Sequence, residues 1–161
     1  SEGAEAADID TSQFNVDLVW KQSAAVHGDT DYGNTYVEID MGEQNVYIFS
    51  EGQCVFETPC VTGRMTRDRA TPEGMYAIRF KQTNRVLTGY NKDGSVSYRS
   101  PVKYWMPFNR GIGLHDASWR RTFGGEIYKN SGSHGCINLP RDAAAQIYEL
   151  VYKGMPVICY Y

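Results

Sequence analysis

Short segments in which apolar and polar residues alternate recur along this chain, separated by turn-forming residues. Alternation with a period of two places one set of side chains on one face, as in a half-buried β-strand. Residues 36–40 and 75–80 show it best, and further strands are predicted at 45–49, 54–58 and 157–160. Sixteen glycines suit the many turns that such short strands need. The sequence therefore predicts a mainly β domain.

Residues 81–110 depart from this pattern and predict an inserted hairpin. Asn91-Lys92-Asp93-Gly94 is a strong tight-turn signal between two apolar segments. The excursion carries the aromatic residues Tyr90, Tyr98, Tyr104, Trp105 and Phe108. Such side chains line a binding cleft in some proteins and pack beneath a long loop in others, and the sequence does not choose between these roles.

One helix is predicted, in the C-terminal half of the chain. Pro140 suits its first turn, and Asp142 suits the positive end of the helix dipole. Apolar residues recur at helical spacing at Ala143, Ala144, Ile147, Tyr148 and Val151. Lys153 and Gly154 fit the end of this helix. The sequence also predicts a continued strand at 60–63, a strand at 111–115 and a loop at 116–130.

A chain of 161 residues is long enough for one domain with its own core. We assign residues 35–161 to this domain and residues 1–34 to an N-terminal linker or the end of an upstream segment. Residues 14–20 alternate like a short edge strand, and His27 has the surroundings of a surface loop. The net charge of −3 argues against a nucleic-acid partner, and no apolar run reaches membrane-spanning length.

The four cysteines lack a Cys-x-x-Cys pair and are too few for a disulfide scaffold. Cys54 and Cys60 lie in one predicted strand, about 20 Å apart, which is too far for a disulfide. Cys60 and Cys159 lie in apolar stretches and are expected to be small buried hydrophobes.

Cys136 has a different setting, because small and polar residues precede it and His134 lies two positions before it. A second histidine, His115, lies upstream, with seventeen residues between it and Ser133. A thiol attacks a carbonyl as the thiolate, and an imidazole can take its proton and later give it to a leaving amine. Gly135 lets the backbone turn, so spacing alone does not choose between the two histidines as the base.

The backbone of the same segment offers a second element of acyl-transfer chemistry. Successive N–H groups from Ser133 to Cys136, expected just before a helix start, can hold the oxyanion that forms when a carbonyl is attacked. Two other interpretations remain open. Cys136 could be structural, or it could bind zinc together with His115, His134 and Asp116.

The pattern of His115, seventeen residues and then Ser133-His134-Gly135-Cys136-Ile137-Asn138 resembles the signature of the L,D-transpeptidases with a YkuD-type catalytic domain. The resemblance extends over about residues 35–161 and is closest to the Gram-positive branch of the family. It is carried further by residues 36–40 and 46–49, by 61–63 with 71–74, and by 100–107 and 114–119.

The resemblance implies a β-sandwich-like fold and an enzyme that cross-links bacterial peptidoglycan. The Cys136 thiolate would attack the third-residue carbonyl of a donor tetrapeptide stem and release D-alanine. The side-chain amine of an acceptor stem would then resolve the thioester and form a 3→3 cross-link. Carbapenems would acylate the same sulfur, and no metal or organic cofactor is implied. The implied location is extracytoplasmic, at the cell wall or envelope, with room for an upstream membrane anchor or wall-binding domain outside this sequence.

The matching positions also imply roles for individual residues. His115 would be the base and then the acid, with its other ring nitrogen held by a backbone carbonyl near Asp116. His134, Gly135 and Cys136 would form the oxyanion site. The remaining assignments are Ser133 as support for the loop, His134 and Asn138 as residues that shape the pocket, and Tyr104, Trp105 and Trp119 as candidates for the substrate cleft.

Three other functions fit the same residues. An L,D-carboxypeptidase would resolve the same acyl-enzyme with water. A peptidoglycan-binding module would keep the fold without catalysis, although the complete pair of His115 and Cys136 argues against that. A general cysteine protease would need no D-residue in its substrate.

Overall fold

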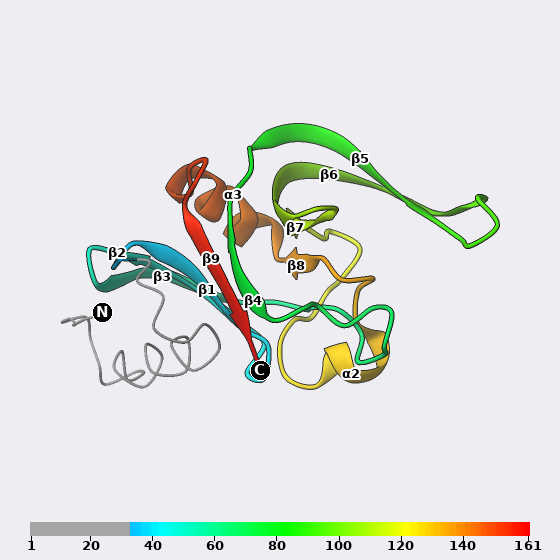
Figure 1. The fold of residues 1–161 in the computed structure, drawn as a ribbon, viewed down its shortest axis with the longest axis horizontal. Coiled ribbons are helices and arrows are strands. Elements are labelled where there is room, and N and C mark those ends of the chain that lie inside the picture. The colour runs from blue at the N-terminus through cyan, green and yellow to red at the C-terminus, as the bar shows by residue number, and fades with distance from the viewer. Residues whose placement is uncertain (1–32) are drawn as a thin grey trace.

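The computed structural model describes residues 33–161, which form two β-sheets and two helices (Figure 1). The mainly β prediction is confirmed. The predicted edge strand at 14–20 and the predicted surface residue His27 lie outside the described residues.

The first sheet has five strands in the order β3-β2-β1-β9-β4. These are β1 (Tyr36–Asp40), β2 (Asn45–Ser50), β3 (Gln53–Pro59), β4 (Gly74–Ala77) and β9 (Pro156–Tyr160). β1 and β9 pair in parallel at the centre, and the other pairs are antiparallel. β4 is shorter than the strand predicted at 75–80. The chain leaves this sheet there, because Ile78 N–H still bonds to Met155 whereas Arg79 N–H bonds to Pro107 of the other sheet.

The second sheet has four strands in the order β5-β6-β7-β8. These are β5 (Gln82–Tyr90), β6 (Val96–Asn109), β7 (Ile112–Asp116) and β8 (Ile137–Leu139). β5 and β6 form the predicted hairpin, whose tip projects away from the rest of the domain (Figure 1). β8 was not expected, because the sequence suggested that the cysteine segment leads straight into a helix. Three residues are too few to show strand alternation, and β8 is defined by its parallel pairing with β7.

The predicted helix is present as α3 (Arg141–Leu150), with Pro140 as its N-cap and not in its first turn. It ends earlier than Lys153 and Gly154, which lie in a turn beyond Val151. The predicted loop at 116–130 is wrong at its end, where a short helix, α2 (Ile127–Ser131), forms. Five residues are too short for a periodic apolar face, so this helix leaves little trace in the sequence. Among the described residues, no helix is long and apolar enough to cross a membrane.

Both sheets and α3 contribute side chains to one buried core, which gives the domain its sandwich-like character. The first sheet contributes Val37, Ile39, Val46, Ile48 and Val157, the second Met106, Leu114, Ile137 and Leu139, and α3 Ala144 and Ile147. Cys60 and Cys159 lie fully buried in this core, as predicted, and all four cysteines are free thiols. The core fixes β7 and β8 side by side, and these two strands present the candidate site.

Candidate active site

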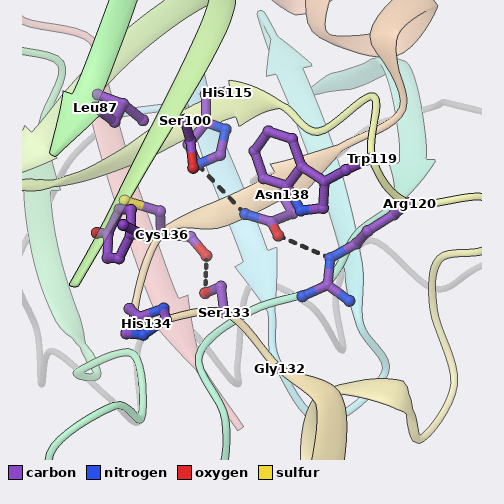
Figure 2. A pocket seen from close by; sticks show the side chains of 11 residues that line it. Leu87, Ser100, His115, Trp119, Arg120, Gly132, Ser133, His134, Cys136 and Asn138 are labelled. Carbon is purple, nitrogen blue, oxygen red and sulfur yellow. Dashed lines mark hydrogen bonds between the residues drawn. The ribbon is translucent and has the colours of Figure 1, made fainter. Parts of the chain in front are cut away.

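The ends of β7 and β8 bring the two principal candidate residues into one pocket. His115 lies on β7 and pairs in register with Asn138 on β8, and Cys136 immediately precedes β8. The pocket has a volume of about 200 Å³ (Figure 2). Its lining residues are Leu87, Tyr98, Ser100, His115, Trp119, Arg120, Gly132, Ser133, His134, Cys136 and Asn138. Segments that are distant in the sequence therefore meet at one cavity beside the cysteine.

The imidazole of His115 is buried and hydrogen-bonded through both ring nitrogens. Its Nδ1 lies 2.7 Å from the Asp116 backbone oxygen, which is the contact that the resemblance implied. Its Nε2 lies 3.3 Å from the side-chain nitrogen of Asn138. The Asn138 amide oxygen accepts a 2.8 Å hydrogen bond from Nε of Arg120, so the amide nitrogen is the atom that faces His115.

These contacts specify the tautomer of His115. A carbonyl oxygen only accepts, so Nδ1 carries the proton, and Nε2 accepts from the Asn138 amide through its lone pair. Burial lowers the pKa of His115, and the nearby positive charge of Arg120 lowers it too, although the Asp116 backbone acts in the opposite direction. The resting imidazole is therefore neutral, with its basic nitrogen on the pocket side.

The Cys136 thiol is partly buried and donates to the backbone oxygen of Gly111 at 3.4 Å. Within residues 33–161 it makes no hydrogen bond to His115 or His134. Burial raises the pKa of Cys136 to about 11, against a lowering contribution from the Gly113 backbone. Burial therefore disfavours a resting thiolate at Cys136. The site rests as a neutral thiol and a neutral imidazole.

The loop before Cys136 is folded around the Ser133 side chain. The Ser133 hydroxyl accepts from Gly135 N–H at 3.0 Å and donates to the Cys136 backbone oxygen. Gly135 has φ +135°, a conformation that L side chains rarely adopt, so the loop requires glycine there. Ser133 thus has the supporting position that the resemblance implied.

Backbone N–H groups in this loop divide into two sets. Those of Ser133 and Gly135 donate to Thr62 O and to the Ser133 hydroxyl. Those of His134 and Cys136 donate no hydrogen bond within the described part of the chain. The groups do not lie at a helix start as predicted, because β8 follows directly.

Residues 60–64 and Thr71 hold this loop from the other side. The predicted strand continuation at 60–63 forms only two isolated bridges, Val61 with Asn138 and Gly63 with Ser133. The buried Thr71 hydroxyl donates to the Gly135 carbonyl at 2.7 Å and accepts from Gly63 N–H at 2.9 Å. These segments clamp the cysteine loop to the body of the domain.

The second histidine lies at the mouth of the pocket. The His134 side chain is exposed, and its ring centroid lies 4.6 Å from that of Tyr98, on β6. Partial burial, and then the charge of Arg69, lower the pKa of His134. Tyr98 comes from the hairpin, so at least one of its aromatic residues lines the cleft. His134 is thus placed as a pocket wall.

The aromatic candidates divide between the pocket and the core. The ring centroids of Trp119 and Trp105 lie 6.0 and 5.9 Å from that of His115, but only Trp119 lines the pocket. Tyr104 packs against Tyr148 of α3 and does not reach the pocket. The Asp116 carboxylate is also directed elsewhere, since it accepts from the N–H groups of Lys103 and Tyr104.

Sequence reasoning missed four residues that build the site. Arg120, Ser100 and Leu87 line the pocket, and Thr71 braces its loop. Thr71 lies in the segment 71–74 that carried part of the resemblance, which was the available signal. Arg120 follows Trp119 in a predicted loop, and nothing in the spacing linked it to Asn138.

The zinc alternative finds no ligand set among the described residues. No group of three or more His, Cys, Asp or Glu side chains comes together there as potential metal ligands. Asp116, one of the four predicted ligands, is occupied by the backbone of β6.

The structure thus defines a mainly β domain with a cysteine and an Nδ1-protonated histidine at a shared pocket. The family model described as the YkuD L,D-transpeptidase catalytic domain matches residues 34–159, and the chain belongs to this family. A probable L,D-transpeptidase 3 from Mycobacterium tuberculosis is 32% identical over 93 residues, which cover 55% of this chain and 33% of that protein.

Solved structures from Enterococcus faecium have the same fold. A crystal structure of a mutant L,D-transpeptidase is 36% identical with a TM-score of 0.73, covering 79% of this chain and 50% of that chain. The NMR structure of the catalytic domain acylated by ertapenem is 37% identical with a TM-score of 0.71. The match covers 81% of this chain and 100% of that chain. The chain thus spans 33% of the M. tuberculosis protein, 50% of the longer E. faecium chain and all of the isolated catalytic domain.

Proposed function

We propose that this chain is the catalytic domain of a peptidoglycan L,D-transpeptidase, with residues 35–161 as that domain and residues 1–34 as a linker or the end of an upstream segment. The observation that carries the proposal is the pocket in which Cys136 lies beside a neutral His115 with a basic Nε2, in a chain that belongs to this family. Peptidoglycan stem peptides would be donor and acceptor, and the location would be outside the cytoplasm, at the cell wall.

The first half-reaction forms a thioester. Nε2 of His115 takes the Cys136 thiol proton, and the sulfur attacks the third-residue carbonyl carbon of a donor tetrapeptide. The new C–S bond replaces the C–N bond to D-alanine, and the proton on Nε2 passes to the leaving nitrogen. Because the Asn138 amide occupies the Nε2 lone pair at rest, this amide has to turn away before the proton moves.

The second half-reaction reverses these roles. The side-chain amine of an acceptor stem attacks the thioester carbonyl and gives its proton to Nε2 of His115. A C–N bond forms, the C–S bond breaks, and the proton returns to the Cys136 sulfur. The product is a 3→3 cross-link.

The developing oxyanion has two available donors in this loop. The N–H groups of His134 and Cys136 are free to point at it, whereas that of Gly135 is bound to Ser133. Gly135 contributes through its backbone conformation, which lets the flanking N–H groups and the thiol face the same pocket. A neutral thiol in the resting site limits side reactions until a substrate is present.

β-Lactams would react with the same sulfur. The E. faecium catalytic domain is acylated by ertapenem, and we expect a carbapenem to acylate Cys136 here. A mass adduct on the wild type that is absent from Cys136→Ala would support this nucleophile. An adduct that persists in Cys136→Ala would contradict it.

Mass spectrometry of muropeptide products tests the proposed reaction. The protein is incubated with disaccharide-tetrapeptide, and wild type is compared with Cys136→Ala. We expect D-alanine and a cross-linked dimer from the wild type and neither product from the variant. Free tripeptide and D-alanine without dimer would instead identify an L,D-carboxypeptidase. Cleavage of peptides that contain only L-residues would identify a general cysteine protease.

A further inference from the structure

Arg120 is a charged side chain in the pocket that neither the family signature nor the proposed reaction uses. Its backbone N–H bonds to Ala117, and its Nε donates to the Asn138 amide oxygen at 2.8 Å. Nε is one of five guanidinium donors, so the two terminal nitrogens remain available. Figure 2 shows the guanidinium beside Asn138, at the end of the pocket away from Cys136.

This cation has no anionic partner in the part of the chain that the structure describes. No carboxylate lies within ion-pair distance of it among residues 33–161. The Asp116 carboxylate, four residues earlier, is occupied by the N–H groups of Lys103 and Tyr104. Arg120 is half-buried, and loss of water lowers its pKa. A partly desolvated guanidinium without a counter-ion at a reactive pocket is suited to an anionic ligand group.

We propose that Arg120 is a specificity-determining residue that binds the terminal carboxylate of the donor tetrapeptide, on the D-alanine that leaves. This inference rests on the proposed function and names the substrate group that the pocket selects. A carboxylate directly after the scissile bond distinguishes a tetrapeptide stem from one that is extended or amidated at that position.

The order of the side chains supports this assignment. The scissile carbonyl has to lie at the Cys136 sulfur, and the leaving nitrogen at Nε2 of His115. The carboxylate of D-alanine lies one carbon beyond that nitrogen. Arg120 lies one amide group beyond Nε2, since the Asn138 amide contacts Nε2 at 3.3 Å and Nε of Arg120 at 2.8 Å. The leaving group therefore extends from His115 toward the guanidinium.

A carboxylate bound at Arg120 would also affect His115, the proposed base. The positive charge of Arg120 disfavours protonated His115, and a bound carboxylate offsets that charge. A carboxylate that binds Nε together with one terminal nitrogen would also replace the Asn138 oxygen, which frees the amide that covers Nε2. A stem without this carboxylate would leave the pocket in its resting arrangement.

The test compares two donors that differ in one charge. The first is disaccharide-tetrapeptide, and the second is the same molecule with its terminal carboxylate converted to a carboxamide. The measurement is kcat/KM for release of D-alanine or D-alaninamide by wild type, Arg120→Gln, Arg120→Lys and Arg121→Gln. Arg121 is an exposed neighbour outside the pocket and serves as the matched control.

Wild type and Arg121→Gln are expected to prefer the carboxylate about tenfold to a hundredfold, as suits a charge-assisted hydrogen bond. Arg120→Gln should turn over both donors at similar, low rates, and Arg120→Lys should retain part of the preference. The proposal is overturned if wild type does not discriminate, or if Arg120→Gln keeps the full preference. A purely structural role through Asn138 would lower both rates equally and leave their ratio unchanged, which also overturns it.

A binding measurement separates this inference from the proposed function. NMR titration of Cys136→Ala with each donor needs no turnover. If the wild type releases no product, the transpeptidase proposal fails, and weaker binding of the carboxamide would still support Arg120 as the carboxylate site. Equal binding of both donors, or binding of neither, would contradict the inference.

Discussion

The side-chain nitrogen of Asn138 lies 3.3 Å from Nε2 of His115 and covers the lone pair that a proton from Cys136 would occupy. Because Arg120 holds the amide oxygen at 2.8 Å, the amide cannot flip without losing that hydrogen bond. With Nδ1 bonded to the Asp116 carbonyl, the imidazole is fixed in one tautomer and one orientation. The resting site is thus held in a neutral form by a chain of side chains from β7, β8 and the loop after β7.

Replacing Asn138 with aspartate is expected to raise the pKa of His115. A carboxylate next to Nε2 favours the imidazolium, whereas the native amide favours the neutral ring. Arg120 limits this rise, because it also pairs with the new charge. A protonated His115 cannot take the thiol proton, so the acid limb of the pH–rate profile for acylation should move to higher pH. The His115 titration by NMR and the acylation rate between pH 5 and 9 measure both effects.

Asn138→Ala is the control, since it removes the amide without adding charge. It should move the acid limb much less than the aspartate. An unchanged His115 titration in Asn138→Asp would contradict the assignment of the amide to Nε2.

Thr71→Val is expected to destabilise the domain and slow acylation. The Thr71 hydroxyl satisfies both the Gly135 carbonyl and Gly63 N–H, and valine has the same shape without either bond. Each buried group left without a partner costs about 1–3 kcal/mol, so the two groups together predict a loss of about 2–6 kcal/mol in the free energy of unfolding. Urea unfolding followed by fluorescence measures the stability.

Thr71→Ser keeps the hydroxyl and should stay within about 1 kcal/mol of wild type, because only a methyl group is removed. If the valine variant were as stable as the serine variant, the Thr71 contacts would not brace the loop.

The sequence was sufficient to locate His115 and the cysteine segment, because a contiguous motif and one spaced histidine need no tertiary information. It was also sufficient for the outer strands and the hairpin, whose alternation and turn residues are local signals. The hydrogen bonds that fix the His115 tautomer could not be predicted from the sequence. Arg120 and His115 meet Asn138 across 18 and 23 positions, through the pairing of a three-residue strand that carries no pattern of its own.

The roles of Thr71, Tyr104 and Trp105 also depend on long-range contacts that the sequence does not reveal. Thr71 reaches Gly135 across 64 positions, so its role could not be inferred from its neighbours in the chain. Tyr104 and Trp105 are adjacent in an aromatic stretch, yet one packs on α3 and the other beneath His115, because successive residues of a strand face opposite sides.

Gly135→Ala should reduce acylation more than it reduces stability. The methyl group itself would meet Ile112 at an ordinary 3.5 Å, so the cost comes from the backbone at φ +135°. A strained conformation of this kind costs about 1–3 kcal/mol, and relaxing it would rotate the N–H groups of the flanking residues away from the pocket. We expect acylation by a carbapenem to slow by about a hundredfold, as for loss of an oxyanion donor.

Gly94→Ala provides the matched control at the hairpin tip. Gly94 also has a positive φ, +90°, and a Cβ added there would meet no atom within 4 Å. It should show a similar loss of stability with little change in acylation rate. Equal losses of acylation rate in the two variants would contradict the proposal that Gly135 orients the flanking N–H groups.

The resting Cys136 thiol should react slowly with an uncharged alkylating reagent at neutral pH. Burial raises its pKa to about 11, and the thiolate is the reactive form. Below that pKa, the thiolate fraction rises about tenfold for each unit of pH, so it is about one part in ten thousand at pH 7. We expect the iodoacetamide rate at Cys136 to climb steadily from pH 7 to pH 9.5, whereas free cysteine begins to level off near pH 8.5.

Mass spectrometry distinguishes the labelled site, because Cys60 and Cys159 are fully buried and burial raises the pKa of Cys54 to about 12. His115→Ala should give the same profile as wild type, since the thiol donates to Gly111 and not to the imidazole. A rate that levels off below pH 8 in wild type and not in His115→Ala would reveal a preformed thiolate–imidazolium pair. In that case the proton would already be on His115 before substrate binds, and the Asn138 amide could not cover Nε2 as it does here.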